Sequence, residues 1–98
     1  MKLNPITLEQ YAAAINVELD VSKLRDAEGK AQGVMVSFKR AETREVGKFG
    51  ILTGVSGRGA TEHQAKRDYA QRLNGKVLVL DSMRNTRREF TIPQGFLK

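Results

Sequence analysis

The residues best suited to chemistry lie in one short stretch, from Gly57 to Arg67, where a glycine-rich turn leads into a predicted helix. Gly57 and Gly59 flank Arg58, and Thr61 occupies the position that caps the first helical turn. Free amides at a helix start, the positive end of the helix dipole and a neighbouring guanidinium together favour a phosphate group. We therefore interpret this stretch as a contact point for a nucleic-acid backbone.

The same stretch lacks the residue types that an enzyme active site would need. Residues 54–61 imitate a nucleotide-binding P-loop, but Ala60 stands where that motif has its lysine. His63 is the only histidine, and the sequence offers it neither a nucleophile nor an orienting acid, so we interpret it as a surface residue. The acidic residues are scattered among cations and lack metal-ligand spacing. We expect a protein that is not an enzyme and that uses no cofactor or metal.

A second group of cations surrounds a predicted turn near the end of the chain. Arg84, Arg87 and Arg88 can fan outward from this turn and form a candidate second phosphate patch. Residues 1–28 carry three cations and five anions, whereas residues 29–98 carry fourteen cations and six anions. In a chain of net charge +6, this asymmetry favours a polyanion-binding face in the later part.

The bulk composition limits the class of protein. A chain of 98 residues has room for one core and therefore for one domain. The absence of cysteine excludes disulfides and thiolate sites and makes a reducing compartment the default. The first residues lack a signal-peptide pattern, and no apolar run approaches the length of a membrane span. We expect a cytoplasmic protein with no membrane partner.

Hydrophobic periodicity predicts two helices that must position these groups. A Thr-x-x-Gln capping box opens each helix, at Thr7 and at Thr61. The helices are predicted over residues 7–15 and 61–73. The second helix is expected to bury one apolar stripe, formed by Ala65, Tyr69, Ala70 and Leu73.

Alternating apolar and polar residues predict strands at residues 15–21 and 34–38, although the first helix could instead extend through Leu19. Further strands are predicted at residues 49–55, at the short apolar run 77–80, and at residues 89–92. Residues 42–48 are interpreted as a charged hairpin end. The predicted fold class is α+β, with the order α-β-β-β-α, both helices on one face of a single antiparallel sheet, and a C-terminal β-hairpin. We assign residues 1–75 to the main unit and residues 76–98 to the hairpin, as an extension of the same domain.

Several residues around the second helix follow a known motif, G-x-G-x-[ST]-K-K-x-A-K-x-x-A-A. The positions in register with it are Gly57, Gly59, Thr61, Ala65, Lys66, Tyr69, Ala70 and Leu73. Over about residues 4–74 the chain thus resembles the double-stranded RNA-binding domain. Residues 4–11 look like the proline-led first helix of that family, and residues 27–32 look like the approach to its first inter-strand loop. Glu62 and His63 stand where the family has paired lysines.

The resemblance implies recognition of duplex RNA by shape, with two minor-groove contacts that flank a phosphate contact. It implies groove contacts from Gln10 and Lys30, and a phosphate contact from the start of the second helix. The full set of candidate nucleic-acid-binding residues is Gln10, Lys30, Arg58, Lys66, Arg67, Arg72, Arg84, Arg87 and Arg88.

Two alternatives stay open. The loss of the paired lysines, together with an exposed edge strand, also fits a protein-binding adaptor or an inhibitor of a partner enzyme. A sheet-based DNA-binding module would instead use Lys39, Arg40 and Arg44 as base readers.

Overall fold

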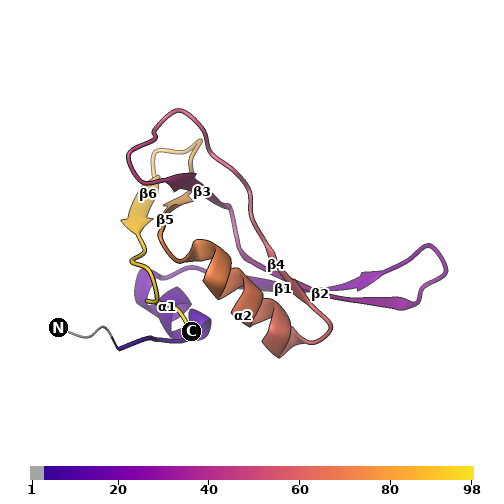
Figure 1. Cartoon of the computed structure of the whole chain (residues 1–98). Coiled ribbons are helices and arrows are strands. Elements are labelled where there is room, and N and C mark those ends of the chain that lie inside the picture. The colour runs from indigo at the N-terminus through magenta and orange to yellow at the C-terminus, as the bar shows by residue number, and fades with distance from the viewer. Residues whose placement is uncertain (1–3) are drawn as a thin grey trace.

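The described part of the chain, residues 4–98, contains two helices and six strands in the computed structural model (Figure 1). The elements are α1 (Leu8–Ile15), β1 (Leu19–Arg25), β2 (Ala31–Phe38), β3 (Ala41–Glu45), β4 (Gly57–Gly59), α2 (Glu62–Leu73), β5 (Lys76–Leu80) and β6 (Arg88–Thr91). The strands form two antiparallel sheets of three strands, ordered β1-β2-β4 and β3-β5-β6. The protein is therefore a small α+β domain, as predicted.

Both helices begin at the predicted caps. At α1 the hydroxyl of Thr7 accepts a hydrogen bond from the Gln10 amide at 3.1 Å, and Gln10 Oε1 accepts one from the Thr7 amide at 2.8 Å. At α2 the hydroxyl of Thr61 accepts from the Gln64 amide at 3.2 Å. The side chain of Gln64 turns instead to the amide of Ala60, at 3.0 Å. These bonds satisfy amides that a helix start leaves without partners.

β1 and β2 form a long hairpin that projects from the rest of the molecule (Figure 1). In the first sheet Val21 lies opposite Val36, and Val36 lies opposite Gly57 of β4. Most of β1 is exposed, whereas Val36 and Phe38 are buried. Only the inner end of the hairpin therefore belongs to the core.

The structure has two sheets where we expected one, and four strands between the helices where we expected three. Arg40 follows β2 with a left-handed φ of 53°, and the chain leaves the first sheet there. The predicted charged hairpin end at residues 42–48 is wrong, because β3 occupies most of it and pairs with β5. The predicted strand at residues 49–55 forms a single bridge, between Thr53 and Thr43. β5 is buried on both faces and needs a partner on each edge, which β3 and β6 supply.

One core joins the helices and both sheets. The predicted apolar stripe of α2 is confirmed, with buried Ala65, Tyr69, Ala70 and Leu73. Leu8 of α1 and Leu78 of β5 belong to the same cluster of buried side chains. The Tyr69 hydroxyl accepts a hydrogen bond from the Phe38 amide at 3.1 Å. Burial raises the pKa of Tyr69 to about 12.

The C-terminal hairpin is present as β5 and β6, which pair with each other. After β6 the chain returns to the first helix, where the amide of Lys98 donates to the Ile6 carbonyl at 3.0 Å. Asn74 also holds Leu97, through two hydrogen bonds of 2.9 Å. Within residues 4–98, neither helix has the length and apolar character needed to cross a membrane.

Candidate nucleic-acid interface

Gly57 and Gly59 allow β4 to pack directly on α2. A Cβ atom added at Gly59 would lie 2.6 Å from the Cβ of Gln64, and one at Gly57 would overlap the Ala65 carbonyl and the Tyr69 side chain. Neither glycine has a positive φ, so close approach of the backbones explains the requirement for glycine. The pattern that suggested a phosphate loop therefore has a packing function.

Side chains of α2 already bind the amides of this loop. Asp68 Oδ2 accepts from the Arg58 amide at 2.9 Å, and Gln64 Oε1 accepts from the Ala60 amide. The same Asp68 oxygen accepts from Arg72 Nε at 2.9 Å. The Arg58 amide, and then the Arg72 side chain, lower the pKa of Asp68. A phosphate on the Arg58 amide would have to displace this ionised carboxylate.

The side chain of Arg58 points away from α2. Side chains alternate between the two faces of a strand, and the neighbouring Gly57 and Gly59 face α2. Arg58 lies opposite Met35 of β2, on the outer face of the first sheet, and is exposed. The sheet therefore separates Arg58 from the cations of α2, with which we had grouped it.

Two predicted phosphate ligands on α2 are held in ion pairs. Lys66 Nζ lies 3.0 Å from Glu62 Oε2 and 3.8 Å from Glu9 Oε1, and its side chain is 22% exposed. Arg72 pairs with Asp68. Binding of a phosphate by either cation would compete with these carboxylates.

Arg67 has no carboxylate partner within residues 4–98 and projects from the exposed face of α2. It lines a groove of about 410 Å³ with His63 and Gln71, which lie about one helical turn before and after it. Thr7 and Lys98 also line this groove, because the end of the chain returns beside the first helix. The groove is the place where an exposed cation of α2 meets α1.

The two predicted groove contacts lie on the elements that the resemblance implies. Gln10 belongs to the first turn of α1, where its side-chain oxygen is engaged by the Thr7 amide. Its side-chain nitrogen is the group left for a ligand. Lys30 lies at the turn of the β1–β2 hairpin, with its side chain 76% exposed and its Nζ 3.9 Å from Glu28.

Two cations that sequence reasoning missed lie on the same side of the first sheet as α2. Lys23 is opposite Val34, and Val34 is opposite Gly59, which touches the first turn of α2. Arg25 follows two residues later, on the same face by alternation, and donates to the Gly29 carbonyl at 3.1 Å. The predicted strand ended at residue 21, so both cations fell outside it. The apolar alternation of Leu19 and Val21 stops at Lys23, and Leu24 lies on the other face, so the pattern gave no signal for a longer strand.

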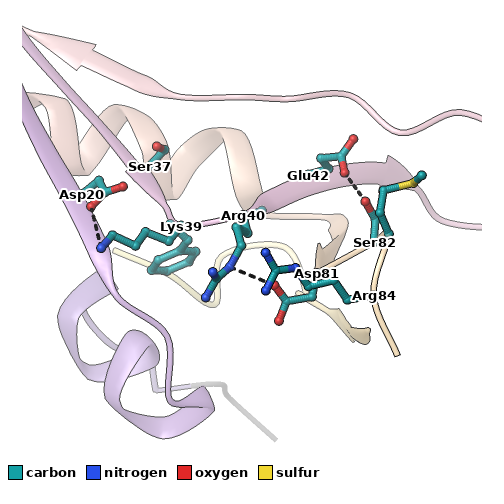
Figure 2. A pocket seen from close by; sticks show the side chains of 11 residues that line it. Asp20, Ser37, Lys39, Arg40, Glu42, Asp81, Ser82 and Arg84 are labelled. Carbon is teal, nitrogen blue, oxygen red and sulfur yellow. Dashed lines mark hydrogen bonds and ion pairs between the residues drawn. The ribbon is translucent and has the colours of Figure 1, made fainter. Parts of the chain in front are cut away.

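Arg84, Arg87 and Arg88 surround the β5–β6 turn, at the opposite end of the molecule from the first turn of α2 (Figure 1). Arg88 Nη1 donates to the Ile15 carbonyl at 2.6 Å, so this cation caps the C-terminal end of α1. Arg87 pairs with Glu89 at 3.2 Å. Arg84 lines a cleft of about 620 Å³ between the two sheets (Figure 2). The three arginines thus have separate surroundings.

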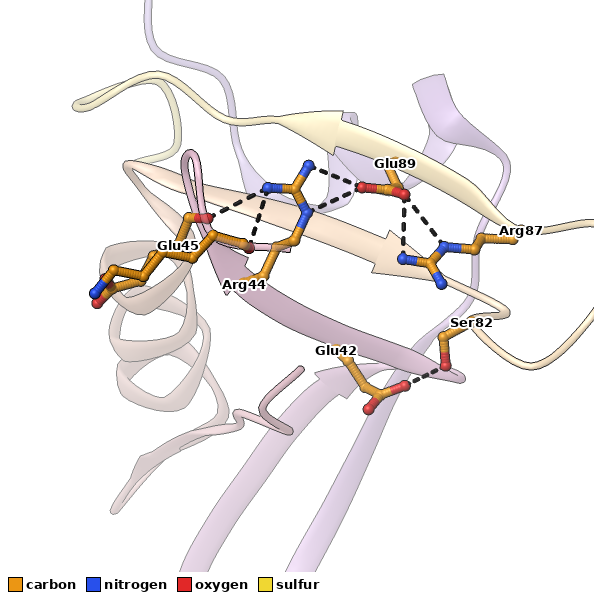
Figure 3. A network of polar contacts seen from close by, with 7 residues as sticks. Glu42, Arg44, Glu45, Ser82, Arg87 and Glu89 are labelled. Atoms are coloured by element: carbon orange, nitrogen blue, oxygen red, sulfur yellow. Dashed lines mark hydrogen bonds and ion pairs between the residues drawn. The ribbon is translucent and has the colours of Figure 1, made fainter. Parts of the chain in front are cut away.

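The side chain of Arg44 is at the centre of a polar network on the outer face of the second sheet (Figure 3). Its Nε and Nη2 atoms lie 3.1 and 3.0 Å from Glu89 Oε1, and its side chain is only 10% exposed. This contact with Arg44, and then the charge of Arg87, lower the pKa of Glu89. Val77 and Val79 are buried on this same face of β5, beneath the long charged side chains.

The other two suggested DNA base readers are also ion-paired. Lys39 Nζ contacts Glu18 and lies 4.0 Å from Asp20, whereas Arg40 Nε lies 3.0 Å from Asp81 Oδ1 (Figure 2). With Arg44 held by the network, none of the three is a free reader on the sheet surface.

The predicted site residues therefore do not form one patch. Gln10 lies on α1, Arg67 on α2 and Lys30 at the turn of the β1–β2 hairpin, whereas Arg58 and the arginines of the β5–β6 turn lie elsewhere. Within residues 4–98 no group of three or more His, Cys, Asp or Glu side chains is arranged to hold a metal ion. Comparison of the chain with protein-family models, curated proteins and solved structures gives no match.

Proposed function

We propose that this protein binds duplex RNA through α1, the first turns of α2 and the β1–β2 hairpin. The observation that carries the proposal is the placement of these three elements. They follow one another across the molecule, with α1 at one side, the start of α2 in the middle and the hairpin projecting at the other side (Figure 1). Recognition of an A-form duplex by shape uses two separated minor-groove contacts with a phosphate contact between them.

The order of the elements supports this proposal. When β3 is set aside, the chain reads α1, β1, β2, β4 and α2, which is the order of the double-stranded RNA-binding domain that the sequence resembles. β1, β2 and β4 are neighbours in one antiparallel sheet. In this proposal β3 takes no part in RNA binding and instead pairs with β5.

The charges predict a lower affinity for duplex RNA than the family motif implies. Glu62 and His63 replace the paired lysines, and Lys66 is engaged by Glu62 and Glu9. On this side of the molecule, Arg67 is the main cation available to the RNA phosphates, and Lys23 and Lys30 add further positive charge. Shape and groove contacts must therefore provide a larger share of the affinity.

A salt titration tests the proposal. Fluorescence anisotropy with a labelled RNA duplex of about 16 base pairs, the length spanned by this kind of domain, should show binding at low salt. About three phosphate contacts predict a slope of log K against log salt of about −3. Absence of binding at low salt, or binding that ignores salt, would contradict the proposal.

Competition separates the alternatives in the same assay. Unlabelled RNA duplex should displace the probe, whereas a DNA duplex of the same sequence should compete poorly, because B-form grooves differ in width and depth from A-form grooves. Equal competition by DNA would favour the sheet-based DNA-binding module. Failure of both nucleic acids would leave the protein-binding adaptor or inhibitor.

A further inference from the structure

Large apolar side chains are exposed together on the loop between β3 and β4. Val46, Phe49 and Ile51 are 62%, 74% and 75% exposed. Exposed apolar side chains that are scattered singly are ordinary, but a cluster on one segment marks an interaction surface. The loop lies at the end of the molecule opposite the first turn of α2 (Figure 1), so the proposed RNA surface does not use it.

This surface is held in place rather than loosely attached. Arg44 Nη1 donates to the carbonyls of Glu45 and Lys48, at 3.3 and 3.5 Å, and its guanidinium lies 4.3 Å from the centre of the Phe49 ring. Thr53 and Thr43 exchange two backbone hydrogen bonds of 2.8 Å. The apolar side chains are therefore presented in a defined arrangement, which lowers the entropy lost on binding.

Residues 49–55 join the outer edge of β3 in the second sheet at a single bridge, between Thr53 and Thr43. Thr53 directs its amide and carbonyl to Thr43 of β3. In an antiparallel arrangement the neighbouring residues, Leu52 and Gly54, direct theirs to the opposite side. Within the described chain, no backbone hydrogen bond is made by residues 49–52, 54 or 55. The edge therefore offers outward donors and acceptors that can pair with a further strand.

Comparison with two other sheet edges shows that this one lacks protection. β1 carries Asp20, Lys23 and Arg25, and β6 begins with Arg88 and Glu89. Charged side chains on an edge oppose pairing with another chain. Residues 49–55, of sequence Phe-Gly-Ile-Leu-Thr-Gly-Val, contain no charge and no proline. Positions 49, 51, 53 and 55 alternate with positions 50, 52 and 54 between two faces, as in a strand.

The surface is also complementary in shape to the same surface of a second copy. A groove of about 360 Å³ has an apolar part formed with Thr43, Ile51, Thr53 and Val55, and it is also lined by the charged residues Arg44, Glu45, Lys48 and Lys76. Arg44 of this lining contacts the ring of the exposed Phe49. A protruding side chain next to a partly apolar groove allows a two-fold contact, because each copy then supplies one protrusion and one groove.

We propose that two copies of this chain associate through residues 46–55. The segments 49–55 pair antiparallel, with the outward edges at Leu52 and Gly54 of the two copies facing each other, and Phe49 of each copy packs at the groove of the other. The dimer leaves the α2 face of both copies open. This inference does not depend on the proposed RNA binding, and it is tested without nucleic acid.

Sedimentation velocity over a concentration series, from micromolar to millimolar, tests the association. The wild-type chain should shift from a mass of 10.9 kDa toward twice that value. The double variant Phe49→Asp/Ile51→Asp should weaken dimerisation by about a hundredfold, because it places charges in the buried centre of the contact. Met83→Asp is the matched control, since Met83 is 95% exposed on the β5–β6 turn, outside this surface. It should dimerise as the wild type does.

A second pair of variants tests the strand pairing itself. Gly54→Pro removes an outward amide and should reduce dimerisation, whereas Gly54→Ala should not, because a Cβ at this position meets nothing within 4 Å. Circular dichroism checks that each variant folds. A wild-type chain that stays monomeric at millimolar concentration would overturn the proposal. It would also be overturned by dimerisation that survives the aspartate substitutions or Gly54→Pro.

Discussion

At the scale of single residues, a cation's role is decided by the carboxylates around it. Lys66 matches the phosphate-binding motif, yet it lies between Glu62 and Glu9. Arg67 is its neighbour in sequence, lines a groove, and has no carboxylate partner in the described part of the chain, residues 4–98. On the proposed RNA surface we therefore expect Arg67, which the motif does not name, to be the main phosphate contact of α2.

Arg67 and Arg72 provide a matched pair of substitutions for this argument. Arg67→Ala should weaken binding of the RNA duplex by about three- to tenfold and make the salt slope shallower by about one, because it removes one phosphate contact. Arg72→Ala should change affinity much less, since Arg72 is paired with Asp68. Anisotropy titrations of both variants measure the difference. Equal losses would show that the ion pair does not determine which cation binds.

At the scale of elements, glycine allows β4 to pack directly against the backbone of α2. Gly57→Ala should destabilise the protein by about 1–3 kcal/mol, because the added methyl group overlaps the Ala65 carbonyl and the Tyr69 side chain. Gly54→Ala is the control and should change stability by less than about 0.5 kcal/mol, since its site is open. Urea unfolding measures both values. A neutral Gly57→Ala would remove the packing explanation for this glycine.

Local pattern predicted the elements whose partners are near in sequence. The capping residues Thr7 and Thr61 placed both helix starts, and the C-terminal hairpin followed from two short apolar runs and a turn. Local pattern did not predict that residues 41–45 form a strand, or that residues 49–55 form only a single bridge. β3 is polar in sequence and becomes a strand because β5, more than thirty residues later, needs a second edge partner.

At the scale of the whole molecule, the net charge of +6 does not indicate which cations are free to bind a polyanion. Much of the positive charge is neutralised by carboxylates spread over both sheets. The pKa values of Glu18 and Glu45 are lowered by neighbouring lysines, and those of Asp68 and Glu89 by hydrogen bonds from arginines. These groups ionise more readily in the folded chain than in the unfolded chain.

Stability should therefore depend on pH in a definite direction. Each lowered pKa adds stability that is present above the unfolded values of 3.8 for Asp and 4.5 for Glu, and that is lost as the pH falls through the folded values. The urea midpoint should be level from pH 7 to about pH 5 and should fall below it. Glu89→Gln should show a smaller fall, because it removes one of the contributing carboxylates. A midpoint that stays constant down to pH 3 would contradict the role assigned to these pairs.

The helices, their caps, the buried stripe of α2 and the final hairpin could be predicted from the amino-acid order, because each depends on residues a few positions apart. The division of the strands into two sheets, and the identity of the cations that remain free, depend on how the whole chain folds. The contacts responsible join distant parts of the chain: Arg44 meets Glu89 across 45 positions, and Arg88 meets Ile15 across 73. Periodicity within a short window carries no information about such pairs, since they form only when the core brings the two segments together.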